Sequence, residues 1–236
     1  MDRPGPAVQA DGEAGTVRRP RGRPRKTQDE RDDGNRRRAL LRCAARLFRR
    51  QGFAATSTRD IAAAVGMQSG SPFYHFESKG ALLYAVMEEG MRSAIAHQSA
   101  ALQAAGARPA DPAAALALLV RRHFDVLLGP DSDFIPVMLY EWRSLSAQQR
   151  SILKRLQKDY ERPWVPVLQA LRDAGRLGAD VKIARLLIFG ALNWSSQWFD
   201  RRGGASLDRL AQEALALFIG CPAPAGASGR GQGAAR

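Results

Sequence analysis

Apolar residues recur at intervals of three and four along most of the chain, the spacing that places them on one face of an α-helix. No segment shows the strict alternation of apolar and polar residues that is typical of a half-buried strand. Pro163 and Pro166 are expected to kink one of the helices near Trp164, because proline cannot donate to the helical ladder. The helices expected from the periodicity cover residues 35–51, 58–65, a segment from Ser69, 78–102, 111–128, 134–142, 147–173, 181–199 and 207–219. The pattern predicts an all-α fold.

Two of the short helices are closely spaced and have well-marked ends. Ser57 and Asp60 form the S-x-x-D pattern of a capping box before the first helix, and Gly66 supplies the positive φ that ends it. The second helix begins at Ser69, because Pro72 lacks an amide hydrogen and is tolerated only in the first turn. Two short helices joined by a tight turn are the layout of a helix-turn-helix, which places its second helix in a groove of DNA.

The candidate DNA contacts lie in this pair of helices and just beyond it. The first turns of the second helix meet base edges, and the guanidinium of Arg59 can reach a guanine with its bidentate fork. Tyr74, His75 and Lys79 carry the hydroxyl, imidazole and ammonium groups that meet phosphates. Core packing is an equally open interpretation of Phe73. The full set of candidates is Ser57, Thr58, Arg59, Ser69, Gly70, Ser71, Phe73, Tyr74, His75 and Lys79.

The surrounding segment, residues 38–87, resembles the DNA-binding domain of the TetR family of transcriptional regulators. The chain departs from the family pattern at Pro72, where a leucine is common, and at Phe73, where a tyrosine is common. Without that hydroxyl the usual polar contact at position 73 is lost, whereas an apolar contact with a thymine methyl remains open. The motifs that carry the resemblance are Leu47-Phe48, Gly52-Phe53, Thr56-Ser57, Ile61-Ala62, Val65-Gly66, Phe73-Tyr74-His75-Phe76 and Ser78-Lys79.

The charge balance agrees with a nucleic-acid partner, since the chain of 236 residues carries a formal net charge of +13. Residues 1–34 are rich in proline, glycine and arginine and are expected to be a disordered basic arm. Within this arm Arg21-Gly22-Arg23-Pro24 resembles an AT-hook, so Arg21 and Arg23 are candidate minor-groove contacts. The alternative is a charged tail that is only solvated.

Two apolar helices near the C-terminus predict self-association. Residues 183–192 are apolar almost all round, and the helix over residues 207–219 has a second wide apolar face. In a lone small domain that surface would be excessive. We expect the two helices to pair with their copies as a four-helix bundle, which gives a homodimer suited to a palindromic operator. Part of this surface can equally belong to the intrachain core. Residues 221–236 are expected to be a disordered tail.

Residues 134–207 resemble the C-terminal domain of a TetR subset that regulates fatty-acid, phenylacetate and steroid-ring degradation. The motifs are Tyr140-Glu141-Trp142-Arg143, Gly190-Ala191-Leu192-Asn193-Trp194, Trp198-Phe199 and Gly203-Gly204-Ala205-Ser206-Leu207-Asp208. The resemblance implies an acyl-CoA effector, with its acyl chain in an apolar tunnel and its phosphates near Arg121, Arg122 or Arg143. The candidate ligand-binding residues are Phe124, Trp142, Arg143, Trp194 and Trp198. Core and dimer packing is the alternative for the aromatic residues, and a structural ion pair with Glu141 is the alternative for Arg143.

These expectations combine into a two-domain regulator. Residues 35–80 form a three-helix helix-turn-helix domain, and residues 81–220 form a helical effector-binding and dimerisation domain. The helix from Ser78 links the two as a lever, and a bound ligand is expected to relieve repression by changing the spacing of the recognition helices. The alternative is an architectural DNA binder of little sequence preference, driven by the arginine-rich arm.

Other classes of function find little support. The chain has no paired carboxylates in an apolar setting, no Gly-rich phosphate loop and no nucleophile elbow, so it is not expected to be an enzyme. Cys43 and Cys221 are far apart and lack metal-ligand partners nearby, so neither a metal nor a cofactor is expected. The most apolar run contains Arg185 and reaches only about half a membrane span. The N-terminus lacks an apolar signal core. We therefore expect a cytoplasmic protein with no membrane partner.

Overall fold

The computed structural model describes residues 1, 28–66, 75–106, 111–130, 132–200 and 202–219. Its helices are α1 (Gln28–Ala55), α2 (Thr58–Ala64), α4 (Lys79–Ala104), α5 (Pro112–Leu128), α6 (Phe134–Glu141), the 3-10 helix η1 (Trp142–Ser144), α7 (Ala147–Glu161), α8 (Trp164–Asp173), α9 (Val181–Trp198) and α10 (Leu207–Phe218). This part of the chain is all-helical, as the periodicity predicts. None of these helices is long and apolar enough to cross a membrane.

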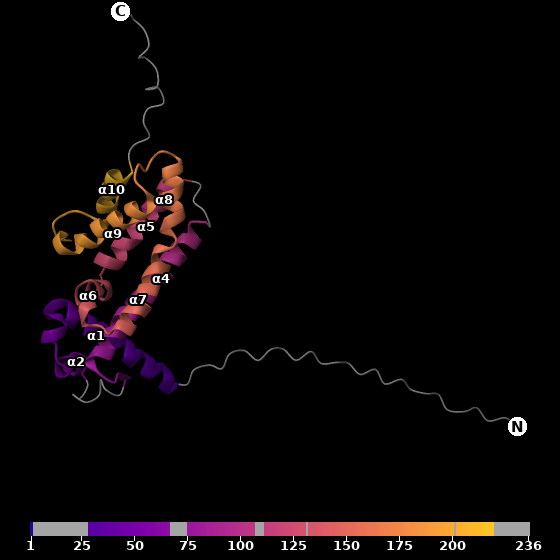
Figure 1. Cartoon of the computed structure of the whole chain (residues 1–236). Coiled ribbons are helices and arrows are strands. Elements are labelled where there is room, and N and C mark those ends of the chain that lie inside the picture. The colour runs from indigo at the N-terminus through magenta and orange to yellow at the C-terminus, as the bar shows by residue number, and fades with distance from the viewer. Residues whose placement is uncertain (2–27, 67–74, 107–110, 131, 201, 220–236) are drawn as a thin grey trace, which may run out of the picture.

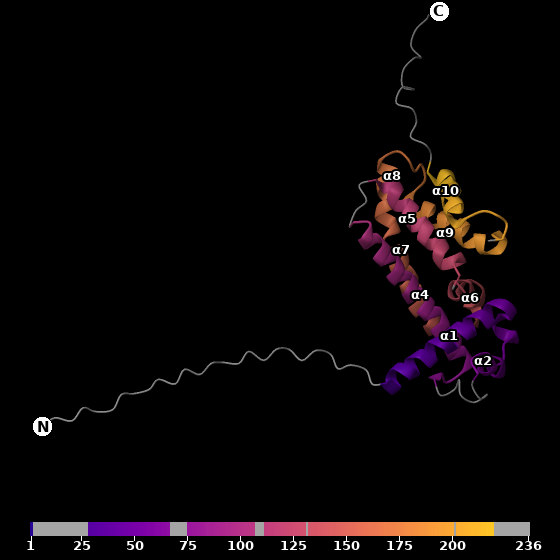
Figure 2. The same cartoon turned by 180° about the vertical axis from the view of Figure 1, so that it is seen from behind.

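The helices form an elongated body, with α1 and α2 at one end and α8, α9 and α10 at the other (Figure 1, Figure 2). The long helix α4 starts beside α1 and packs along its length on α1, α5, α6 and α7. At the far end α5 packs on α8, α9 and α10. The short helix α6 contacts both α1 and α4, so it lies between the two ends of the molecule.

Most helix ends follow the capping residues in the sequence. The side chain of Ser57 accepts a hydrogen bond from the amide of Asp60, and the Asp60 carboxylate accepts one from the amide of Ser57. Gly66 has the expected positive φ, 68°. The predicted caps of α4, α5, α9 and α10 are also confirmed by side-chain hydrogen bonds, at Ser78, Asp111, Asp180 and Ser206.

Two helices differ from the prediction. Helix α1 begins at Gln28, seven residues before the predicted start at 35, so it includes the end of the segment expected to be a disordered arm. Apolar periodicity does not reveal this start, because residues 29–33 are mainly acidic and acidic residues favour the first turns of a helix. The kinked helix expected over residues 147–173 is instead two helices, α7 and α8, with Pro163 as the N-cap residue of α8.

A buried glutamine ties the long helix α4 to α7 and α8. Gln98 is 2% exposed. Its side-chain nitrogen donates to the backbone carbonyl of Tyr160 at 2.8 Å, and its side-chain oxygen accepts from the indole nitrogen of Trp164 at 3.0 Å. Buried polar groups are stable only when they are paired, so these two bonds fix how α4 meets the junction of α7 and α8.

A second buried polar cluster joins α5, α7 and α9. The ring of His123 lies 3.1 Å from the Tyr160 hydroxyl through Nδ1, and 3.1 Å from Oδ1 of Asn193 through Nε2. Because an amide oxygen can only accept, Nε2 carries the hydrogen and Nδ1 accepts from the tyrosine. Burial lowers the pKa of His123 to about 4. The ring is therefore neutral at neutral pH.

Replacing Gln98 by methionine tests the first cluster. The variant leaves the Trp164 indole N–H and the Tyr160 carbonyl buried without partners, so we expect the free energy of unfolding to fall by about 2 kcal/mol. The exposed Gln103 lies in the same helix, and Gln103→Met should change stability by less than about 0.5 kcal/mol. Urea unfolding at a fixed protein concentration measures both. Equal losses in the two variants would contradict the assigned role of Gln98.

The buried imidazole predicts a specific acid sensitivity. An unfolded histidine titrates near pH 6.5, whereas His123 titrates near 4 in the fold, so the unfolded state takes up the proton first. Stability from the neutral ring is complete above about pH 6.5 and is lost progressively as the pH falls to about 4, by about 3 kcal/mol in total. Unfolding measured from pH 7 to 4.5 shows the slope, and most of it should disappear in His123→Asn. A variant that keeps the full slope would refute the assignment.

Candidate DNA-binding surface and effector cavity

The start of α2 contains three of the predicted DNA contacts. The hydroxyl of Ser57 accepts from the amide of Asp60 at 3.1 Å, and the amide of Ser57 donates to the Asp60 carboxylate at 2.8 Å. These hydrogen bonds hold the pKa of Asp60 below its usual value. Ser57 therefore shapes the helix end. Thr58 is half-buried, whereas Arg59 is exposed, so Arg59 is the contact predicted on α2 that is open to solvent.

The predicted recognition helix falls largely outside the described residues. The predicted contacts there are Ser69, Gly70, Ser71, Phe73 and Tyr74, and the two arm residues outside the described ranges are Arg21 and Arg23. The described chain resumes at His75, which is half-buried. Contact of these residues with DNA stays a prediction.

Lys79, the first residue of α4, closes the end of α1. Its ammonium donates to the carbonyl oxygens of Phe53 and Thr56, each at 2.8 Å, and lies 4.4 Å from the centre of the Phe53 ring. A longer bond, 3.4 Å, reaches the carbonyl of Ala54. Orphan carbonyls at a helix end favour a cation. No local pattern in the sequence indicates this structural role, and the predicted phosphate contact of Lys79 stays a prediction.

Helix α6 holds the same part of α1 from the other side. At its N-terminal end Asp133 forms an ion pair with Arg49, 3.0 Å long. At its last residue the Glu141 carboxylate accepts from the backbone amide of Phe53 at 2.8 Å, just where Gly52, with φ of 82°, interrupts the helix. The sequence left open a pair between Glu141 and Arg143, and it had no signal for a bond between residues 88 positions apart.

Two adjoining hollows open between α6 and the long helices. The first, called the cleft, has a volume of about 400 Å³ and is lined by Gly90, Ser93, Ala94, His97, Arg122, Asp125, Val126, Pro130, Ser132, Phe134 and Ile135. The second, called the inner cavity, has a volume of about 50 Å³ and is lined by Met91, Ala94, His123, Val126, Ile135, Met138, Leu139, Gln157, Tyr160, Glu161, Phe189 and Asn193. The two share Ala94, Val126 and Ile135, so the cleft borders directly on the inner cavity.

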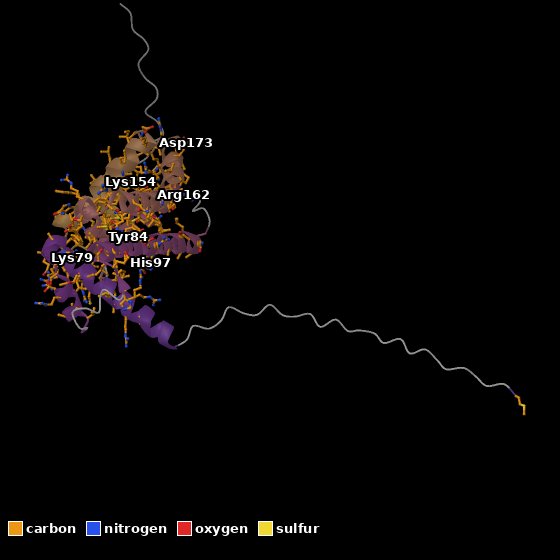
Figure 3. All side chains as sticks on the ribbon, turned by 60° about the horizontal axis from the view of Figure 1, so that its bottom comes forward. Lys79, Tyr84, His97, Lys154, Arg162 and Asp173 are labelled. Carbon is orange, nitrogen blue, oxygen red and sulfur yellow. The ribbon has the colours of Figure 1, made fainter. Side chains whose placement is uncertain are left out.

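The two hollows differ in chemistry. The inner cavity is mainly apolar, and its polar residues include the hydrogen-bonded cluster of His123, Tyr160 and Asn193. Burial raises the pKa of Tyr160 well above its usual value, so its hydroxyl stays protonated. The cleft instead has basic side chains, Arg122 and His97. Figure 3 shows Lys79 and His97 well apart, and both belong to α4.

The predicted ligand-binding residues lie in three places. Phe124 is buried in α5, 2% exposed. Trp142 is half-buried and Arg143 is exposed, both in η1. Trp194 and Trp198 are 65% and 59% exposed on α9. None of the five lines the cleft or the inner cavity. Their effector role stays a prediction, and the residues that do line the inner cavity were missed because they come from five helices.

The two exposed tryptophans belong to an apolar face on the last two helices. On α9 they are joined by Ile183, Leu186 and Leu187, and Leu217 on α10 is 84% exposed. Arg121, which the sequence offered as a phosphate contact, bonds to Asp125 and to Asp208. This bridge fastens α10 to α5.

Comparison with known families covers both ends of the described chain. The family model for bacterial regulatory proteins of the tetR family matches residues 40–86, and the model for the tetracyclin repressor-like C-terminal domain matches residues 109–221.

Individual relatives and solved structures resemble the chain over most of its length. The chain is 28% identical to the HTH-type transcriptional repressor KstR2 of Rhodococcus jostii (strain RHA1), over 83% of this chain and 95% of that protein. Among solved structures, the superantigen PfiT is 39% identical, with a TM-score of 0.65 over 78% of this chain and 96% of PfiT. AibR in complex with isovaleryl coenzyme A and operator DNA is 24% identical and has the same fold, with a TM-score of 0.69 over 78% of this chain and 98% of AibR.

The two family models together span the helix-turn-helix segment and the helices α5 to α10, and they agree with the resemblance found in the sequence. The chain belongs to the TetR family and is a DNA-binding transcriptional regulator, not an enzyme.

Proposed function

We propose that this protein is a dimeric repressor that binds a palindromic operator and is released from it by a small-molecule effector, an acyl-CoA. The observation that carries the proposal is the position of α6, which lines both hollows and also bonds to α1 at Arg49 and Phe53. KstR2, the relative at 28% identity, is named a repressor, which favours the same mode of action.

In this proposal the two domains bind different partners. Residues 35–80 supply the DNA contacts, with Arg59 reaching a base edge and Tyr74 and His75 meeting phosphates. Residues 81–220 supply the effector site and the dimer contacts. The basic arm, through Arg21 and Arg23, adds salt-dependent affinity in the minor groove. An architectural binder would rely on the arm alone, whereas a repressor also needs the helix-turn-helix surface.

Dimerisation through α9 and α10 accounts for the exposed apolar face. A contiguous patch of large apolar side chains is rare on a monomer and is typical of an interface. Two-fold pairing of α9 and α10 would cover Leu186, Leu187 and Leu217, and it would give two recognition helices related by the symmetry of a palindrome. Trp194 and Trp198 would then serve the dimer, and an effector role for them requires a ligand that reaches this interface.

The two hollows suit a ligand with one apolar end and one anionic end. The inner cavity receives the acyl group, where its carbonyl can accept from the side-chain N–H groups of Asn193. Arg122 and His97 in the cleft face the anionic part. The solved structure of AibR, which shares the fold, holds isovaleryl coenzyme A, so the fold is compatible with such a ligand.

Release follows from differential binding. An effector shifts an equilibrium only by binding one conformation better than the other. A ligand that packs against Ile135 and Met138 favours one position of α6, and α6 is bonded to α1. A shift of α6 therefore changes the orientation of the helix-turn-helix domain. The spacing of the two recognition helices in the dimer changes with it.

Two substitutions test the DNA-binding surface. Arg59→Ala and Tyr74→Ala should each weaken binding to the palindromic operator at least about tenfold, because each removes a base or phosphate contact. The exposed Arg155 on α7 gives a matched control, and Arg155→Ala should leave the affinity unchanged. Fluorescence anisotropy with DNA from the upstream region of the gene measures all three at one salt concentration. Unchanged binding in both test variants, with a steep salt dependence, would favour the architectural binder instead.

A ligand panel tests the effector. Isovaleryl-, octanoyl- and phenylacetyl-CoA are titrated into the complex of protein and operator, with the three free acids as controls. We expect at least one thioester to release the DNA and the free acids to have no effect, because the acids lack the part of the ligand that meets the cleft. Tight operator binding that is indifferent to the whole panel would keep the repressor and discard the acyl-CoA.

A further inference from the structure

The cleft does not end at α6 but continues toward α1. A third hollow, of about 180 Å³, is lined by Arg38, Leu41, Arg42, Glu89, Ser93 and Phe134. A fourth, of about 150 Å³, is lined by Arg42, Arg46, Asp133 and Phe134. The cleft and the third hollow share Ser93 and Phe134, and the third and fourth share Arg42 and Phe134. Adjoining hollows therefore form one groove that runs past Phe134 from the inner cavity to α1.

The far end of this groove is basic. Arg38, Arg42 and Arg46 are spaced by four residues, so they lie along one face of α1, and all three are exposed. We call them the arginine stripe. Within the described residues, Arg38 and Arg42 form no ion pair, whereas the guanidinium of Arg46 donates to the sulfur of Cys43 at 3.3 Å. The spacing of these arginines in the sequence does not by itself indicate a role for the stripe.

Acidic residues along the groove only partly offset this charge. Asp133 is paired with Arg49, and Asp125 in the cleft is paired with Arg121 and Arg122. Glu89 is the remaining carboxylate among the lining residues of the third hollow. The groove thus changes from an apolar inner cavity, through a mixed cleft, to an end where cations are in excess.

We propose that this groove binds the effector along its whole length, with the phosphates of its nucleotide part held by Arg38 and Arg42 of the DNA-binding domain. The inference rests on the acyl-CoA effector proposed above and extends its anionic part past Arg122 and His97 of the cleft to the arginine stripe. Guanidinium groups bind phosphate with two parallel hydrogen bonds, and Arg38 and Arg42 have no competing carboxylate partner among the described residues.

An effector placed in this way contacts the DNA-binding domain directly. Its acyl end lies among helices of the C-terminal domain and its phosphates lie on α1, so one molecule bridges the two. A bridging ligand stabilises the one orientation of α1 relative to α4 and α6 in which both ends are bound. The coupling then runs through the ligand as well as through α6.

Ligand binding to the full-length protein, measured by isothermal titration calorimetry, tests the proposal. Isovaleryl-, octanoyl- and phenylacetyl-CoA are compared with the same acyl groups on pantetheine, which lacks the nucleotide and its phosphates. In Arg38→Ala and in Arg42→Ala, the thioester that binds the unsubstituted protein should lose affinity about tenfold, and its pantetheine counterpart should bind as before. Arg36→Ala, an exposed arginine of α1 outside the groove, is the matched control and should bind both as the unsubstituted protein does.

Three other results would overturn the placement of the phosphates. A thioester that binds the unsubstituted protein and both variants equally well overturns the placement of its phosphates and leaves the acyl-CoA effector standing. Variants that lose operator affinity but keep thioester affinity assign the stripe to DNA and also overturn it. Failure of all three thioesters to bind the unsubstituted protein removes the effector itself, and this inference with it. Circular dichroism of each variant confirms that the fold is retained.

Discussion

The C-terminal end of α1 is held from two sides by charged groups, and the relation between the two ends of the molecule depends on it. Lys79 neutralises the carbonyls left without partners where the helix stops, and the Glu141 carboxylate takes the Phe53 amide that Gly52 leaves outside the helical ladder. Helix ends need such partners because their backbone groups have none within the helix. Here the partners come from α4 and α6. The closure of one helix thereby joins the DNA-binding domain to the helices α4 and α6.

The short helix α6 is the part of the structure where these connections meet. Its first turn borders the cleft through Phe134 and Ile135, and its end bonds to α1 through Glu141. On another side the hydroxyl of Tyr140 lies 2.7 Å from Ser196 of α9, the helix that bears the exposed apolar face. A displacement of α6 would therefore change its contacts with the DNA-binding domain and with the helix of the proposed dimer interface. In the proposed mechanism, the effector, the operator and the partner subunit all act through this one short helix.

Buried polar groups give the C-terminal domain its shape, and they also give the inner cavity its chemistry. Gln98 fixes α4 against α7 and α8, while the neutral ring of His123 joins Tyr160 to Asn193 across three helices. An apolar core of the same volume would pack these helices in several alternative ways, whereas paired polar groups favour one arrangement. The same cluster leaves hydrogen-bonding groups at the wall of a cavity that is otherwise apolar.

Local sequence determined the helices and the family, and tertiary structure decided the site. Ser57, Gly66, Ser78 and Asp111 mark helix ends because capping acts over a few residues, and the helix-turn-helix motif is likewise contained in one short segment. The first turns of α1 escaped prediction because apolar periodicity does not mark a helix start built from acidic residues. The inner cavity and the bond from Phe53 to Glu141 escaped for a different reason: they join residues far apart in the chain, which only the packing of the helices brings together.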